Sequence, residues 1–242
     1  MRKLIALVAT LLSATFAHAD CTVQSDSGTT HAHLIELYSS EGCSSCPPAE
    51  AWLRSVHNDA QAVALEFHVD YWDALGWRDR FASARYTARQ KAFAARAGGA
   101  GIYTPQVVLD GHEWRDWYRH PEVPAASSKA TMKLSVEPGT PLHVRVDTTA
   151  SGASDASAYA NYVVLIEDGL SSQVRAGENR GTLLHHDHVV RAFVGPLAHA
   201  DTEVSMPSDV NWSHAAIVAF AQRAGDGDIA QVVMLPLAKC QR

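Results

Sequence analysis

The fold of the first half of the chain is decided by one stretch, LIELYSSEGCSSCPP, at residues 34–48. Residues 34–38 are mostly apolar and β-capable, which is typical of a buried central strand. A turn follows at Gly42. Pro47 and Pro48 are compatible only with the first turn of a helix, and good helix formers come after them. The stretch therefore predicts a strand, a turn and a helix, with a Cys-x-x-Cys motif at the helix N-terminus.

The residues that follow predict the rest of an α/β unit. Apolar residues alternate over 63–69, which indicates a strand. Asp79 is placed to cap a helix that stops at Gly98-Gly99. Residues 106–109 and the Asp110-Gly111 pair predict a strand that turns into a hairpin. The predicted order is therefore β, α, β, α, β, β.

The second half of the chain has a different pattern. Short, often alternating apolar runs are separated by Gly, Pro, Asp and Asn, which favours an all-β, sandwich-like domain. Prolines and an Ala/Ser-rich patch separate this pattern from the first half. We therefore expect an α/β N-terminal domain at residues 20–120, a linker at 121–130 and a β-sandwich-like domain at 131–242.

The N-terminus predicts export. Residues 1–19 combine Arg2 and Lys3 with an apolar stretch and a small-residue cleavage site, so we expect a signal peptide and a periplasmic or secreted product. No later apolar run is long enough to span a bilayer, so stable membrane insertion is not expected after cleavage. The formal net charge of −6 argues against a nucleic acid partner.

The Cys43-Ser44-Ser45-Cys46 motif has three interpretations: half of a zinc site, a structural disulfide or a redox dithiol. A zinc site usually needs four ligands, and the other two cysteines are not paired in the sequence. A structural bond that closes so short a loop would stabilise the fold only slightly. The order strand, turn, motif and helix is the one that thioredoxin-like redox sites use, so the redox interpretation is favoured.

Within this interpretation, Cys43 is the expected nucleophile. The positive end of the helix dipole would favour its thiolate, while Cys46 would be the more shielded resolving thiol.

The remaining cysteines, Cys21 and Cys240, are expected to form a structural disulfide. They are the only cysteines outside the motif, and export implies an oxidising compartment. Chain termini also often lie close together at the surface.

Asp70 follows the strand predicted at residues 63–69, at the sheet edge that carries the cysteine pair. It is a candidate catalytic residue that could relay protons to Cys46. The alternative is that Asp70 caps a turn and that Tyr71, Trp72 and Trp77 are packing residues.

Histidines gather at residues 185–188, but alternation places only His186 and His188 on one face of a strand. Two ligands are too few for a typical metal site, so no metal and no cofactor are expected. We expect Glu178, Asn179 and His186 to have structural, hydrogen-bonded roles at a turn or at the domain interface.

Thr104-Pro105 ahead of a predicted strand resembles the cis-proline of the thioredoxin superfamily, and we include both residues in the candidate catalytic site. Residues 34–48, 67–73 and 101–106, followed by 177–181 and 186–191, resemble the motifs of domain of unknown function family 1223. This resemblance implies a secreted, thioredoxin-like protein and implies no reaction. The sequence departs from the pattern at Pro121 and Pro124, where a closing helix would be expected, and at His188, where asparagine would be expected.

The leading hypothesis is a periplasmic thiol-disulfide oxidoreductase, or a redox-dependent thiol-binding protein, whose partner is a protein or a small thiol or disulfide. One alternative is a protein that handles Cu(I) or another soft metal with the same cysteines. Another is a binding module that keeps the fold without turnover.

Overall fold

The computed structural model describes residues 21–24, 32–56, 58, 61–99, 101–119, 128–150 and 159–240. The predicted signal peptide and most of the predicted linker lie outside the described residues. Two α-helices and fourteen strands are described: β1 Cys21–Gln24, β2 His33–Ser39, α1 Pro47–Ser55, β3 Ala62–His68, α2 Ala84–Arg96, β4 Gln106–Leu109, β5 His112–Glu113, β6 Ala130–Glu137, β7 Leu142–Ala150, β8 Tyr159–Glu167, β9 Leu170–Gln173, β10 Leu183–His186, β11 Val189–Val194, β12 Asp201–Val204, β13 Ala215–Arg223 and β14 Ile229–Pro236. Within these ranges, no helix has both the length and the apolar character needed to cross a membrane.

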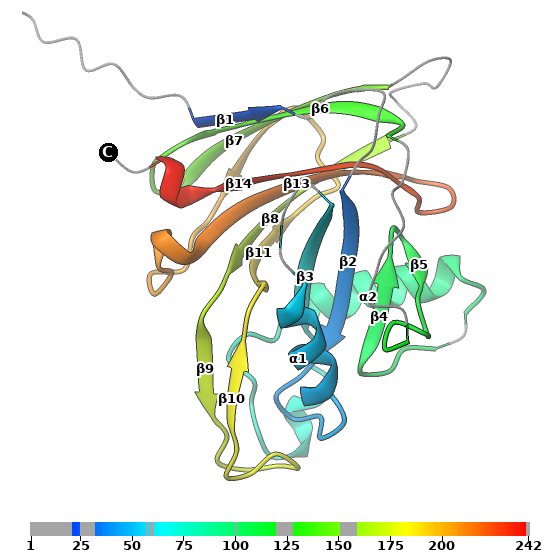
Figure 1. The fold of residues 1–242 in the computed structure, drawn as a ribbon, viewed down its shortest axis with the longest axis vertical. Helices are drawn as coiled ribbons and strands as arrows, with labels where there is room; N and C mark the ends of the chain where they lie inside the picture. Colours follow the sequence, from blue (N-terminus) through cyan, green and yellow to red (C-terminus); the bar gives the residue numbers. More distant parts are fainter. Residues whose placement is uncertain are drawn as a thin grey trace, which may run out of the picture.

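The strands form three sheets, so the fold is rich in β structure (Figure 1). The largest sheet has the order β14-β13-β8-β11-β3-β2-β4-β5. A second sheet has the order β1-β6-β7-β12, and β9 and β10 form a separate hairpin.

From β2 onward the first half has the element order that its sequence predicts, but α2 is capped by Ser83 and not by Asp79. β2 and β3 are parallel neighbours, and β4 lies antiparallel on the other side of β2. Side chains alternate along β2, so Ile35 packs toward Leu53 of α1 while Leu34 belongs to the cluster that contains Phe93 of α2. The two helices therefore lie on opposite faces of the sheet, and β2 and β3 are buried on both faces.

The second half contains no α-helix among its described residues, as predicted. The four-stranded sheet, which takes β1 from the first half, packs on strands of the large sheet and gives the sandwich-like arrangement. The contacts include side chains such as Met132, Leu134, Leu165 and Ile217.

The expected core of the second half is present, because one apolar cluster consists almost entirely of its residues, but another cluster is shared between the halves. β11 of the second half lies parallel to β3 of the first half, where Val189 pairs with Glu66. One apolar cluster also combines Phe67 and Tyr86 with Phe193 and Phe220. The halves therefore share a sheet and a core, so the predicted linker does not divide two independently packed units.

The two ends of the described chain are joined covalently. Cys21 in β1 and Cys240 form the expected disulfide, with a Cα–Cα distance of 5.5 Å across a sequence separation of 219 residues. β1 is an edge strand that pairs only with β6, so this bond fixes it to the C-terminal end of the chain.

Candidate functional site

The Cys43–Cys46 disulfide lies at the start of α1, as the sequence predicts. We call residues 43–46 the CSSC turn. The backbone N–H of Cys46 donates to the carbonyl of Cys43 at 3.2 Å, and Cys46 is the N-cap of the helix. Pro47 and Pro48 occupy the next two positions and carry no N–H group, so this helix end offers fewer donors than a usual N-terminus.

Both cysteines are buried, with 0% exposure for Cys43 and for Cys46. The expectation of an exposed Cys43 beside a shielded Cys46 is therefore wrong for this oxidised state, in which the exposed residues of the turn are Ser44 and Ser45. The hydroxyl oxygen of Ser45 lies 3.4 Å from the Cys43 sulfur, within hydrogen-bonding distance.

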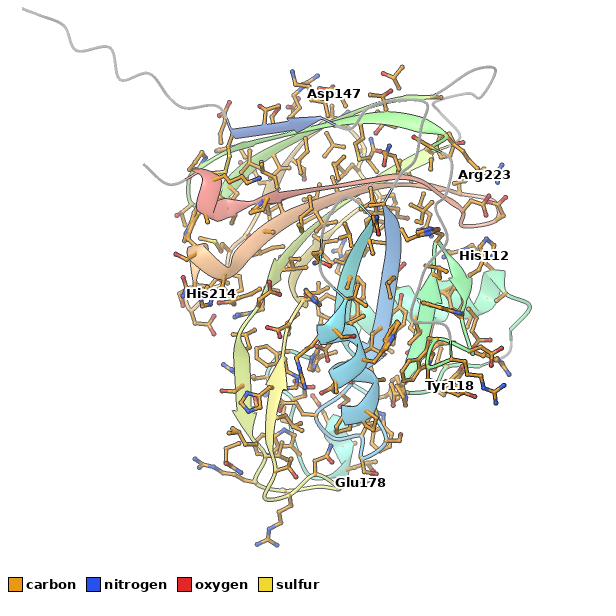
Figure 2. The ribbon with its side chains drawn as sticks, viewed as in Figure 1. His112, Tyr118, Asp147, Glu178, His214 and Arg223 are labelled. Carbon is orange, nitrogen blue, oxygen red and sulfur yellow. A yellow bond between two sulfur atoms is a disulfide. The ribbon has the colours of Figure 1, made fainter. Side chains whose placement is uncertain are left out.

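A loop from the second half of the chain covers the turn. The β9–β10 hairpin runs alongside α1, and its connecting residues 174–182, the covering loop, reach the CSSC turn (Figures 1 and 2). Asn179 donates through Nδ2 to the carbonyls of Glu41 and Cys43 at 2.9 and 3.0 Å, and the N–H of Ser44 donates to Glu178 at 3.0 Å. The predicted hydrogen-bonded role of Glu178 and Asn179 at the interface between the halves is confirmed, whereas both ring nitrogens of His186 lack a hydrogen-bond partner among the described residues.

Thr104 and Pro105 are joined by a cis peptide bond, as expected. Trp72 connects this peptide to the segment before the cysteines, because its Nε1 donates to the Thr104 hydroxyl at 2.9 Å. On its other side, a Cβ added to Gly42 would lie 3.2 Å from the Trp72 Cβ. Trp72 therefore sits between the cis peptide and the CSSC turn.

The Asp70 side chain is hydrogen bonded to α2. Its carboxylate accepts a hydrogen bond from the Thr87 hydroxyl at 2.6 Å. The Asp70 backbone N–H donates to the oxygen of that Thr87 hydroxyl at 3.2 Å. Asp70 makes no hydrogen bond to either cysteine in the part of the chain that the structure describes. The geometry favours the alternative role of Asp70 at a turn, because its carbonyl accepts a hydrogen bond from the N–H of Asp73 at 3.1 Å.

Sequence reasoning missed a buried polar cluster beneath the CSSC turn. Six ionisable residues there are each at most 2% exposed. We call them the buried cluster: Glu41, Glu50, Glu66, His68, Asp79 and His186. The available signal was the pair Glu66 and His68, which alternate on a strand that is buried along its whole length. Ionisable side chains are rarely buried without partners, so this pattern marks a site.

Short distances connect the members of the cluster. His68 Nδ1 lies 2.6 Å from Asp79 Oδ2, and His68 Nε2 lies 3.2 Å from Glu66 Oε1. His186 Nε2 lies 3.6 Å from Glu41 Oε1, and its Nδ1 lies 3.5 Å from Glu50 Oε2.

Several of these atom pairs are close together without forming a hydrogen bond. Glu41 Oε1, Glu66 Oε1, His68 Nε2 and both ring nitrogens of His186 are buried without a hydrogen-bond partner.

The pKa values of the cluster residues depend on burial, which disfavours the charged form of each group, and on the charges of neighbouring members of the cluster. Burial raises the pKa of Glu50 to about 7, and the Glu66 carboxylate adds to this. Burial would also raise the pKa of Glu66, but the charge of His68 and the nearby His186 outweigh it and hold this pKa at about 2. Burial opposes protonation of His186, yet the carboxylates of Glu41 and Glu66 outweigh it and raise its pKa to about 9. The cluster therefore favours positive charge next to its carboxylates.

The side chains of the histidine-rich segment point to different places, because β10 ends within the segment at His186. The predicted pairing of His186 and His188 on one strand face is wrong, because the strand ends at His186 and His188 has a φ of +61°, in the left-handed region that asparagine tolerates better. The His188 ring lies against Asn58 and the carbonyl of Val56, at 3.2 and 3.1 Å. His186 instead meets His68, with ring centroids 5.1 Å apart.

Comparison with known proteins identifies the family and the fold. A family model described as protein of unknown function (DUF1223) matches residues 34–222. A structural genomics protein from Agrobacterium tumefaciens has a similar structure, with a TM-score of 0.60 and 24% identity over 88% of this chain and 97% of that one. HBP35 of Porphyromonas gingivalis is also similar, with a TM-score of 0.59 and 13% identity over 88% of this chain and 77% of that one. No curated protein matches the chain.

Proposed function

The chain belongs to the DUF1223 family, whose description assigns no activity, and from the geometry of the site we propose that it is a thiol-disulfide exchange protein acting through Cys43 and Cys46. The observation that carries the proposal is the Cys43–Cys46 disulfide at the N-terminus of α1. We further propose that β2, α1, β3, α2, β4 and β5 form a thioredoxin-like unit, because their order and the cis Thr104–Pro105 peptide fit that arrangement.

The proposed reaction transfers two electrons. In the reduced protein, the Cys43 thiolate attacks one sulfur of a substrate disulfide, so that a mixed disulfide forms and one substrate thiolate leaves. The Cys46 thiolate then attacks the Cys43 sulfur, which closes the Cys43–Cys46 bond and releases the second substrate thiolate. The protein dithiol is oxidised and the substrate disulfide is reduced, and the same steps in reverse oxidise a substrate dithiol.

Access to the cysteines requires movement of the covering loop. Both sulfur-bearing residues are buried, and Asn179 and Glu178 hold the loop against the turn. A substrate thiolate must reach a sulfur along the disulfide axis, so exchange occurs only when the loop opens. We propose a protein or a small thiol or disulfide as the partner.

We also propose an oxidising, extracytoplasmic location. Residues 1–19 have the composition of a cleavable signal peptide, and the Cys21–Cys240 bond is compatible with an oxidising compartment.

The burial of both cysteines favours a second candidate function, a binding module that keeps the disulfide without turnover. A third, the binding of Cu(I) by the reduced pair, uses the preference of thiolates for soft metals. The three functions differ in what the cysteines do in solution.

A trapping experiment separates them. The Cys46→Ser variant keeps the proposed nucleophile and lacks the resolving thiol, so a mixed disulfide with a model substrate such as glutathione disulfide should accumulate. The Cys43→Ser variant is the matched control and should trap far less. Titration of the wild type in glutathione buffers would give a reduction potential within the range of exchange proteins. Equal trapping by the two variants, or a disulfide that no glutathione buffer reduces, would refute the proposal. Copper binding by the reduced pair, in the absence of trapping, would favour the third candidate.

A further inference from the structure

Three metal-ligand side chains meet in the buried cluster. One ligand atom from each of Glu66, His68 and His186 lies within 4.8 Å of the others. These side chains are at most 1% exposed, and their facing atoms have no hydrogen-bond partner. Buried polar atoms without partners are costly, and each requires an explanation. We propose that these three side chains, together with Glu50, bind a divalent transition-metal ion, for which Zn²⁺ fits the donor set.

The ligand atoms of Glu66, His68 and His186 have separations close to those of a tetrahedral site. Metal–ligand bonds of about 2.0–2.2 Å place neighbouring ligand atoms about 3.3 Å apart in a tetrahedron. His68 Nε2 and Glu66 Oε1 are separated by 3.2 Å. His186 Nδ1 lies 3.5 Å from Glu50 Oε2 and 3.9 Å from Glu66 Oε1. The Glu50 carboxylate lies outside the group of ligand atoms that are within 4.8 Å of one another, so it would have to rotate toward the other ligands to complete the shell.

The surrounding residues orient the ligands. His68 Nδ1 is bonded to Asp79 at 2.6 Å, which leaves its Nε2 free to face the site. His186 Nε2 faces Glu41, which leaves Nδ1 as the ligand atom. The Ser39 hydroxyl donates to Glu50 Oε1 at 2.5 Å and leaves Oε2 for the ion. Such carboxylate–histidine–metal arrangements are the usual outer shell of protein metal sites.

The charges of the cluster are compatible with a bound cation. Four carboxyl groups and two imidazoles share a volume from which water is excluded. Buried carboxylates persist only when they are paired or coordinate a metal. A dication bound by Glu50 and Glu66 would balance the two ligand carboxylates directly.

The site has the character of a structural one. Once Glu50 has rotated toward the other three ligands, all four ligands would come from the protein, and all are buried, which would leave no position open for substrate. They belong to α1, β3 and β10, so one ion would join the element that follows the CSSC turn to the hairpin that covers it. This inference does not depend on turnover by the cysteines.

The test uses the mature chain, purified without chelator or reductant so that all four cysteines stay in disulfides. Elemental analysis should find about one transition-metal ion per chain. Removal of the ion should lower the melting temperature, and added Zn²⁺ should restore it. The double variant Cys43→Ser/Cys46→Ser should keep the ion, which excludes thiolate ligands and separates this test from that of the exchange reaction.

Variants on one strand give a matched comparison. His186→Gln should lose at least tenfold in Zn²⁺ affinity. His185→Gln alters the neighbouring exposed side chain of β10 and should bind Zn²⁺ as the wild type does. If His186→Gln does not fold, Co²⁺ in the oxidised wild type provides a second readout, because a tetrahedral nitrogen and oxygen site gives visible ligand-field bands.

Two results would overturn the assignment. One is an oxidised wild type that contains no transition metal and binds neither Zn²⁺ nor Co²⁺. The other is a folded His186→Gln protein that keeps full affinity.

Discussion

Asn179 donates a hydrogen bond of 3.0 Å to the backbone carbonyl of Cys43, across 136 residues of sequence. The same Nδ2 atom donates to the carbonyl of Glu41, so one buried amide holds both sides of Gly42. This relationship makes the second half of the chain part of the cysteine site. It also identifies the residue whose removal should open the site.

Asn179→Ala should speed reduction of the Cys43–Cys46 disulfide. The change leaves two buried carbonyls without this donor, at a cost of about 1–3 kcal/mol, so the covering loop opens more often. The rate of reduction by dithiothreitol should rise about tenfold, because exchange requires the open state. Arg180→Ala, which alters an exposed neighbour, is the control, and equal rates for the two variants would show that the loop does not limit access.

Glu36→Gln should destabilise the whole protein. Arg89 donates to the Glu36 carboxylate at 2.6 and 2.7 Å, and both side chains are buried. Breaking a buried ion pair leaves an uncompensated charge, so we expect the free energy of unfolding to fall by about 3–5 kcal/mol. Urea denaturation measures this.

The control for that variant is a pair on the surface. Arg145 and Asp147 are also hydrogen bonded, but about half of each side chain is exposed. Asp147→Asn should therefore change stability far less. Similar losses for Glu36→Gln and Asp147→Asn would contradict the importance of the buried pair.

The two disulfides should differ in their effect on stability. Cys21→Ser/Cys240→Ser removes a bond that closes 219 residues and should cost up to about 5 kcal/mol in the loop-entropy model. Cys43→Ser/Cys46→Ser removes a bond that closes three residues and should cost about 2 kcal/mol in the same model. Urea unfolding of both double variants would decide. Hydrogen exchange should locate the loss in the first case at β1, and the opposite ranking would exclude a chain-entropy origin.

Cutting the chain between the halves should not separate them. A protease site inserted at residues 121–127 would divide the sequence, but β3 and β11 share a sheet and Phe67 packs on Phe193. The two pieces should elute together in gel filtration after cleavage and reduction of the Cys21–Cys240 bond. Elution as two folded species would restore the model of independent domains.

Trp72→Phe and Thr104→Val should each lower the free energy of unfolding, because both remove the same hydrogen bond. Each removes the 2.9 Å hydrogen bond between Trp72 Nε1 and the Thr104 hydroxyl, at an expected cost of about 1 kcal/mol. The double variant should cost no more than the larger single change, because the bond is lost only once. Full additivity in urea denaturation would show that the bond does not couple the cis peptide to Trp72.

Much of the local structure could be predicted. The two prolines placed the start of α1, and Asp110-Gly111 placed the turn between β4 and β5. The cysteine pairing could be predicted because Cys43 and Cys46 lie close together in the sequence, which leaves Cys21 and Cys240 to pair with each other. The position of Asp70 after β3 indicated its neighbourhood but left open the direction of its side chain, which the hydrogen bond from the Thr87 hydroxyl decides.

The sequence by itself determined the helices, the alternation of the strands and the two disulfides, because proline geometry, side-chain periodicity and cysteine chemistry act over short ranges or on few residues. Only the tertiary structure decided that β11 joins β3, since many strand pairings satisfy the same alternating pattern. It also decided that His186 meets His68 and Glu66, and that Asn179 covers Cys43. Whether a side chain is buried depends on which segments pack against it. For His68, Glu66 and Cys43, one of those segments belongs to the other half of the chain.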